Sequence, residues 1–218
     1  MSHEPHRRTS FQKTWDFIQD ISPYFIINLV WIFFTVLIVT AIPAVAGLYY
    51  ATNKLAHGKT SGLDAFFKGA KKYFGVSWKW GLPNLAIAFL FTVNFWFYRS
   101  ISWEYSDYMN LLFYLLLFAW VSINLYIFPF LIEQQKPDLR TAIRNSAITF
   151  FRFPAQSIGL LLLYIFLIWL SSIKLPVLWI VVTGMIITYS SNKMTIYAVK
   201  KIGIDGDAGE ENEVRKVD

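Results

Sequence analysis

The sequence predicts an all-α fold: a polytopic α-helical membrane protein with about five transmembrane helices and further amphipathic helices at the membrane interface. The first observation is composition, since 56% of the 218 residues are hydrophobic and only 16% are charged. In soluble domains roughly half of the residues are hydrophobic and about a quarter are charged. The second is a mean hydropathy of +0.43. The third is a series of uncharged runs of about 20 residues, the length that crosses a bilayer.

Three regions are expected along the chain. Residues 1–23 form a polar tail and an amphipathic helix, residues 24–201 a single membrane domain, and residues 202–218 a disordered tail. Within the membrane domain, the expected spans are about 24–50, 81–98, 108–131, 156–171 and 175–192. Pro43 is expected to break or kink the first span, because proline removes a helical hydrogen bond. A re-entrant first span is the alternative to a full crossing.

Two basic connections, 51–80 and 132–155, are each expected to form an amphipathic helix. In the first, apolar residues recur at helical spacing on one side: Leu63, Phe66, Phe67, Ala70, Phe74 and Trp78. In the second, the corresponding residues are Leu139, Ala142, Ile143, Ala147 and Phe150. The opposite sides are polar and mostly basic, with Lys68, Lys71, Lys72 and Lys79 in the first connection and Arg140, Arg144, Asn145 and Arg152 in the second. Such helices favour the headgroup layer, so Lys68, Lys71, Lys72, Arg140 and Arg144 are predicted to dock lipid or a partner.

The balance of charge indicates the partner and the topology. The net charge is +6 and the pI about 9.4, but the basic residues lie next to apolar spans. The lipid bilayer and its anionic lipids are therefore the expected counterpart, and nucleic acid is not. Lysine and arginine concentrate in both connections and the C-terminal region, which predicts that these are cytoplasmic. With five spans the N-terminus is outside and the C-terminus cytoplasmic, whereas a re-entrant first span returns the N-terminus to the inside.

The two connections also suggest an internal repeat. Leu63 aligned with Leu139 places Lys68 on Arg144 and Phe74 on Phe150, each 76 residues apart. A repeated unit of basic helix plus membrane hairpin would explain the match. A simpler explanation is that any cytoplasmic loop feeding a membrane helix tends to be basic and amphipathic.

No residue pattern indicates catalysis. The chain has no cysteine, which excludes disulfides, thiolate metal sites and a cysteine nucleophile, and it carries none of the usual nucleophile, zinc or phosphate motifs. We therefore expect no enzyme, no cofactor and no metal. The polar residues expected at membrane depth include four amides: Asn28, Asn84, Asn94 and Asn124. They could line a solute path, but hydrogen bonds between helices are the favoured interpretation.

Residues 11–80 resemble the YesL-like family of bacterial integral membrane proteins of unknown function. The resemblance rests on Asn28-Leu29 to Trp31, Val39 to Pro43, Leu48-Tyr49-Tyr50, Lys54-Leu55, Phe66-Phe67-Lys68 and Lys71 to Phe74. Many members have glycine where this chain has Ile42, so the bend there can differ. The resemblance implies a multi-pass protein of the bacterial plasma (inner) membrane, often encoded beside carbohydrate-uptake systems, and it implies no catalytic residues.

Two functions remain open at this point. The first is a non-enzymatic accessory or interaction protein, supporting a membrane transporter complex such as a sugar importer through its basic amphipathic helices. The second is a small solute permease that acts as an oligomer and uses the asparagines of its spans.

Overall fold

The computed structural model describes residues 25–101, 104–179 and 183–203, and this part of the chain is helical without a strand. The tail and helix expected at 1–23, and nearly all of the tail expected at 202–218, lie outside the described residues. The helices in chain order are Phe25–Val36, α2 (Ile38–Ala56), α3 (Leu63–Lys72), α4 (Phe74–Ser100), α5 (Ser106–Glu133), α6 (Leu139–Arg152), α7 (Pro154–Trp169), the π-helical turn η1 (Leu170–Lys174) and α8 (Gly184–Ile202).

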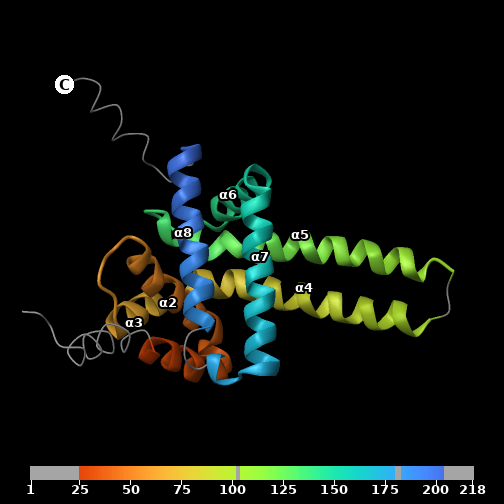
Figure 1. The fold of residues 1–218 in the computed structure, drawn as a ribbon, viewed down its shortest axis with the longest axis horizontal. Helices are drawn as coiled ribbons and strands as arrows, with labels where there is room; N and C mark the ends of the chain where they lie inside the picture. The colour runs from red at the N-terminus through yellow and green to blue at the C-terminus, as the bar shows by residue number, and fades with distance from the viewer. Residues whose placement is uncertain (1–24, 102–103, 180–182, 204–218) are drawn as a thin grey trace, which may run out of the picture.

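A long hairpin of α4 and α5 projects from a body formed by the other helices (Figure 1). The two helices have 27 and 28 residues, so each is about 40 Å long, comparable to a bilayer with its headgroups. No charged residue lies between Lys79 and Arg99 or between Asp107 and Glu133. The predicted spans 81–98 and 108–131 fall inside these two helices, and the hairpin has the length and composition of a membrane-crossing unit.

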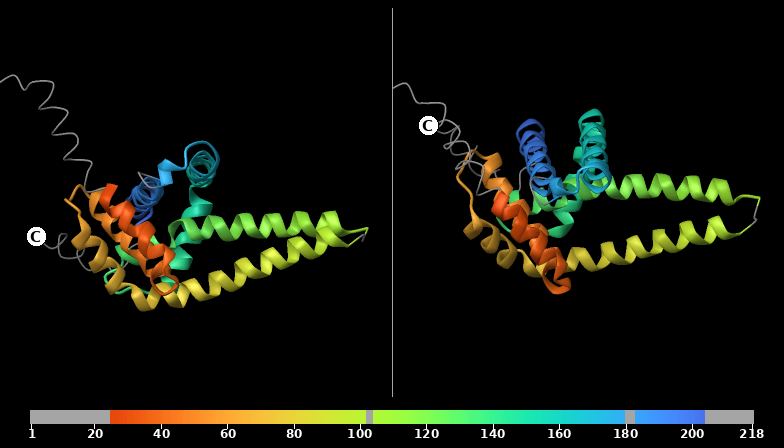
Figure 2. Two further views of the ribbon diagram at one scale, coloured as in Figure 1. Left: turned by 90° about the horizontal axis from the view of Figure 1, so that it is seen from below. Right: turned by 60° about the horizontal axis from the view of Figure 1, so that its bottom comes forward.

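Helices α7 and α8 run across the hairpin rather than alongside it (Figures 1 and 2). The segment Pro154–Lys174, which contains the predicted span 156–171, is the third helix long and apolar enough to cross a membrane. These three helices indicate a membrane protein, but the expected count of about five crossings is not confirmed. If the bilayer normal is parallel to the α4–α5 hairpin, α7 is not parallel to the normal in this arrangement.

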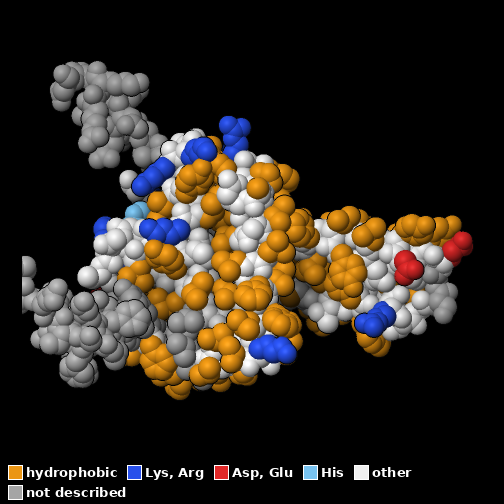
Figure 3. All heavy atoms as spheres, in the orientation of Figure 1, with side chains coloured by type: hydrophobic (Ala, Val, Ile, Leu, Met, Phe, Trp, Pro, Cys, Tyr) orange, Lys and Arg blue, Asp and Glu red, His pale blue; other side chains and the backbone are white. Residues whose placement is uncertain are grey.

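The surface of the hairpin matches this interpretation. Seen as spheres, its flanks are hydrophobic or uncharged, acidic side chains gather at the tip, and most of the visible basic side chains lie on the body (Figure 3). Large apolar side chains such as Phe89, Trp96, Leu111 and Leu115 are exposed along it. Because isolated exposed apolar residues are common but continuous apolar surface is not, the hairpin flanks require an apolar environment.

The first apolar run is two helices, and the break lies at Leu37 instead of Pro43. Leu37 has extended dihedrals (φ −80°, ψ 108°), and the Thr40 hydroxyl donates to the carbonyls of Phe34 (2.8 Å) and Leu37 (3.2 Å). Pro43 stays inside α2. Its missing N–H would orphan the carbonyl of Val39, four residues earlier, but the indole of Trp78 donates to that oxygen at 3.1 Å. Of the two outcomes expected at Pro43, a break or a kink, the break was therefore wrong.

The helix Phe25–Val36 and α2 pack together around a small core that includes Ile27, Ala44, Leu48 and Phe66. Neither helix reaches the length and hydropathy of a candidate span. The segment joining them, Val36–Val39, is exposed and wholly apolar. The structure therefore shows two short helices where a single first span of 24–50 was expected.

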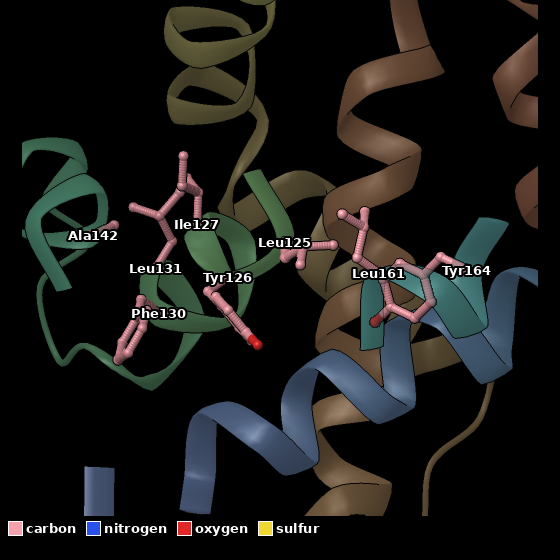
Figure 4. Packing of buried hydrophobic residues seen from close by; sticks show 8 residues of the cluster. All are labelled: Leu125, Tyr126, Ile127, Phe130, Leu131, Ala142, Leu161 and Tyr164. Atoms are coloured by element: carbon pink, nitrogen blue, oxygen red, sulfur yellow. The ribbon is translucent and has the colours of Figure 1, made fainter. Parts of the chain in front are cut away.

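A second core joins α5, α6 and α7. Ala142 of α6 faces Ile127 and Leu131 of α5, while Leu161 and Tyr164 reach in from α7 (Figure 4). The Tyr164 hydroxyl donates to the carbonyl of Ile187 at 2.6 Å and pairs with Ser191 at 2.5 Å. Buried hydroxyls of this kind hold membrane helices together where the hydrophobic effect cannot.

The fifth predicted span, 175–192, does not match one described helix. Helix α7 continues through η1 and ends in a turn at Leu175, whose N–H donates to Leu170 at 2.8 Å. Helix α8 begins at Gly184, after the undescribed residues 180–182, and it is not among the candidate spans. It runs on to Ile202, so its basic end extends well beyond residue 192.

Candidate functional site

Helix α3 lies against α2 because two glycines allow a close approach. A side chain added at Gly47 of α2 would come within 2.7 Å of the carbonyl of Phe66, and one added at Gly69 would meet the ring of Tyr50. The helix ends at Tyr73, which is almost fully buried, and α4 begins at the next residue. This packing fixes which side of α3 faces outward.

The predicted apolar side of α3 is divided in two by this packing. Ala65, Phe66 and Gly69 are buried against the body. Leu63, Phe67 and Phe74 remain 36%, 47% and 43% exposed, and they form a stripe beside the buried face. We call these three residues the α3 stripe. The expectation of one apolar face was therefore only partly right, because Phe66 alone of its large side chains is buried.

The basic side of α3 continues around the helix from this stripe. Lys68, Lys71 and Lys72 are exposed, and the Lys72 ammonium lies 4.9 Å from the centre of the Tyr73 ring. None of the three lies within ion-pair distance of a carboxylate in the described residues, where the one contact of this kind joins the His57 ring to Glu133 at 2.9 Å. Helix α3 thus presents an apolar stripe and an uncompensated basic face next to each other.

A groove runs between α3 and the start of α2. It has a volume of about 260 Å³, and its lining is almost wholly apolar, with one charged residue. The lining residues are Phe34, Thr40, Pro43, Ala44, Phe66, Phe67, Ala70, Lys71 and Phe74. Aromatic contacts close one wall, because the Phe34 ring lies 5.7 Å from Phe67 and 6.3 Å from Phe66.

Helix α6 lies against α5 and is built differently. Asp138 caps its first turn, where its carboxylate accepts a hydrogen bond from the Thr141 N–H at 2.8 Å. Hydrogen bonds from the side chain and from the backbone N–H of Thr141 lower the pKa of the Asp138 carboxyl below its usual value. On the buried side, Ala142, Asn145 and Ser146 face the body, and the Ser146 hydroxyl donates to the carbonyl of Ile123 in α5. Asn145, expected on the basic side, is therefore buried.

The outward side of α6 carries Arg140, Arg144 and Arg152, all exposed. Among them stand Phe151, which is 78% exposed, and Ile148. A shallow depression of about 440 Å³ is lined by Arg144, Ala147, Ile148, Phe151 and Arg152. We call this set together with Arg140 the α6 face. Unlike the α3 stripe, its apolar residues are surrounded by arginine.

Comparison with known proteins gives one match. A family described as "Protein of unknown function, DUF624" matches residues 24–95. The matched segment includes the helix Phe25–Val36, α2, α3 and most of α4, and so it contains the α3 stripe and the groove. The match supports similarity to an uncharacterised family, but it does not confirm the YesL-like name. No curated protein and no solved structure matches the chain.

The four predicted asparagines do not converge on a common site. In the matched segment, Asn84 and Asn94 donate to the carbonyls of Trp80 (2.9 Å) and Leu90 (2.7 Å), four residues earlier in α4. Asn28 donates to the carbonyl of Trp179 at 2.6 Å. Asn124 accepts from the Trp80 indole at 3.1 Å, which ties α5 to α4. Asn28 and Asn124 thus link separate segments, as expected for hydrogen bonds between helices, whereas Asn84 and Asn94 bond within their own helix.

A polar cluster that the sequence reasoning missed joins α2, α5 and α8. The Asn53 amide donates to Glu133 at 2.5 Å, and Asn192 donates to the Tyr49 carbonyl at 3.0 Å. His57 contacts the same Glu133 oxygen at 2.9 Å. The only sequence signal was that His57 and Glu133 both lie at helix ends. No group of three metal-ligating side chains occurs among the described residues.

Proposed function

We propose that this protein is a non-enzymatic accessory protein of the bacterial plasma membrane whose α6 face docks an acidic partner. The observation that carries the proposal is the exposed Phe151 set among three arginines with no ion-pair partner in the described chain. Aromatic residues and arginine are the side chains that most often dominate protein interfaces. An acidic segment would supply the missing counter-charge.

A protein partner fits α6 better than lipid does. The inner side of α6 is already covered by α5, through Ala142 and Ser146. A helix that rests in lipid needs a continuous outward apolar stripe, whereas the short apolar set of Ala147, Ile148 and Phe151 on α6 lies between Arg144 and Arg152. A small aromatic centre rimmed by charge is the arrangement of a protein interface.

The topology we propose places the α4–α5 hairpin across the bilayer and the basic body at the cytoplasmic side. Helices α3 and α6 both lie away from the hairpin tip (Figure 1), where lysine and arginine would follow the positive-inside tendency. The exposed apolar turn at Val36–Val39 favours the re-entrant alternative for the first apolar run, since the carbonyls of Leu37 and Val39 accept hydrogen bonds from Thr40 and Trp78. The N-terminus would then lie on the cytoplasmic side. Reporter cysteines labelled from each side of intact cells test this placement.

The resemblance to the YesL-like family suggests that the partner is a component of a carbohydrate importer. Affinity purification in mild detergent should recover that component with the wild-type chain. Arg144→Glu should reduce its recovery at least about tenfold, because a charge reversal at an interface costs more than 1.4 kcal/mol. The matched control is Lys59→Glu, at an exposed position outside the α6 face. Equal recovery with both variants would refute docking through α6.

The permease alternative is less favoured, because the amides of Asn84 and Asn94 bond to their own helix. We expect reconstituted vesicles to show no sugar flux above protein-free vesicles. A flux that disappears with Asn124→Leu would favour the permease instead.

A further inference from the structure

We propose that the groove between α3 and α2 binds one acyl chain of an anionic phospholipid, with the phosphate of the headgroup at Lys71 and Lys68. This inference rests on the proposed placement of α3 at the membrane surface. It assigns a ligand to a site separate from the α6 face.

The shape and lining of the groove select an acyl chain. Its volume of about 260 Å³ is below the roughly 300–1,000 Å³ of pockets that enclose drug-sized ligands. Phe34, Phe67 and Phe74 supply aromatic walls, and Pro43 and Ala44 supply a floor without charge. A narrow apolar groove accepts a slender hydrocarbon segment and leaves the rest of the molecule outside.

The charges beside the groove select an anionic headgroup. Lys71 is the one charged residue in the lining, and Lys68 lies one turn away on the same exposed side. Asp64, the one acidic residue of α3, forms no ion pair within the described residues. A phosphate near the two ammonium groups would therefore meet positive charge that the described chain does not neutralise.

The residues around the groove indicate how the phospholipid would be oriented in it. Thr40 and Pro43 line one side of the groove close to the exposed apolar turn Val36–Val39, while Lys71 lies with the basic residues of α3. Polarity thus rises from the turn toward α3, as it does from the tail to the headgroup of a phospholipid. The bound chain would extend the α3 stripe toward the bilayer interior.

Native mass spectrometry of the full chain tests the proposal with two phospholipids of identical acyl chains. We expect phosphatidylglycerol to be retained more strongly than phosphatidylcholine. Lys71→Gln should lower phosphatidylglycerol retention by about fivefold and phosphatidylcholine retention by less, because the choline cation offsets the charge of its phosphate. Lys59→Gln, which removes an exposed lysine away from the groove, should behave as the wild type. Equal retention of both lipids, or equal effects of the two variants, would overturn the proposal.

Photocrosslinking checks the position of the chain. A photoreactive phenylalanine analogue replaces Phe67 in the groove or, as the control, Phe151 on the α6 face. Crosslinks to the acyl chain of phosphatidylglycerol are expected at position 67 in clear excess over position 151. Comparable yields at both positions would contradict a specific groove site. Arg144→Glu should leave lipid retention intact, so failure of partner docking and failure of lipid binding are distinguishable.

Discussion

The segments α2–α3–α4 and α5–α6–α7 have the same order of elements but are held together by different contacts. In each, an apolar helix leads to a shorter basic helix, then to a break at Tyr73 or Phe153, then to a second apolar helix. The short helices begin at Leu63 and Leu139, 76 residues apart. The shared order is what a repeat would produce, but the expected unit of a basic helix plus a membrane hairpin stays a prediction, because α8 is not among the candidate spans.

The contacts at equivalent positions show the difference. In the first segment, Gly47 lets α3 approach, and an added side chain would come within 3.1 Å of Ala70. In the second, 76 residues later, Ile123 and Ser146 occupy these places and are joined by a hydrogen bond. The first segment uses close backbone approach, and the second uses side-chain packing and hydrogen bonds. Helix α3 is therefore left with the exposed α3 stripe, whereas the inner side of α6 is covered by α5.

The largest expected effect comes from removing the close approach of α3 to α2. Gly69→Ala adds a methyl group that would lie 2.8 Å from Tyr50 Cγ, so α3 must shift. Overpacking of this kind costs about 1–3 kcal/mol. Thermal unfolding in detergent should show a clearly lower midpoint. Gly75→Ala is the control, because nothing lies within 4 Å of a side chain added there. Equal midpoints for both variants would show that glycine packing does not distinguish the two segments.

A smaller effect is expected where the second segment depends on hydrogen bonds. Tyr126 donates to Ser157 at 2.9 Å in a buried position and ties α5 to α7. Tyr126→Phe should cost about 0.5–1.5 kcal/mol. Its counterpart 76 residues earlier is Tyr50, whose hydroxyl has no hydrogen-bond partner in the described chain, so Tyr50→Phe should change stability by less than about 0.5 kcal/mol. Chemical unfolding of both variants measures the difference. Similar losses would mean that the hydroxyl of Tyr126 is not what fastens the second segment.

Sequence periodicity predicted the hairpin well because its signal is local. The uncharged runs after Lys79 and after Asp107 match α4 and α5 closely, since length and hydropathy alone define such helices. The break at Leu37 was not predictable in this way. Pro43 stays helical because Trp78, far along the chain, donates to the carbonyl that proline leaves free. A hydrogen bond between residues far apart in the sequence does not appear in the hydrophobic periodicity of either segment.

The candidate site was only partly predictable, because some of its features depend on local spacing and others on contacts between distant residues. Spacing identified Lys68, Lys71 and Lys72 as one exposed side, and the structure agrees. Spacing could not predict that Phe66 is buried while Phe67 is exposed. This difference depends on where Gly47 and Gly69 bring α2 and α3 together. Spacing also placed Asn145 outside, although the residue is buried against the body. Which side of a helix is covered depends on its neighbours as well as on its own pattern.

The smallest expected effect concerns the caps of the two short helices. Asp138 caps α6 as a carboxylate, whereas α3 begins at Gly62 without a side-chain cap. Because the side-chain and backbone hydrogen bonds from Thr141 lower the pKa of Asp138, this stabilisation is complete above the ordinary aspartate pKa of roughly 4. It is lost as pH falls through the lower folded value. Hydrogen exchange, corrected for intrinsic rates, should therefore show the first turn of α6 losing protection on acidification while that of α3 does not.

Asp138→Asn separates this titration from general acid unfolding. Asparagine is also a favourable cap but carries no titrating group, so the variant should keep its protection in the first turn of α6 throughout the same pH range. If α3 and α6 instead lose protection together in the wild type, and the variant follows the same curve, the acid sensitivity comes from the shared body. The two short helices would then differ in their outward faces and in their packing, but not in how their first turns are held.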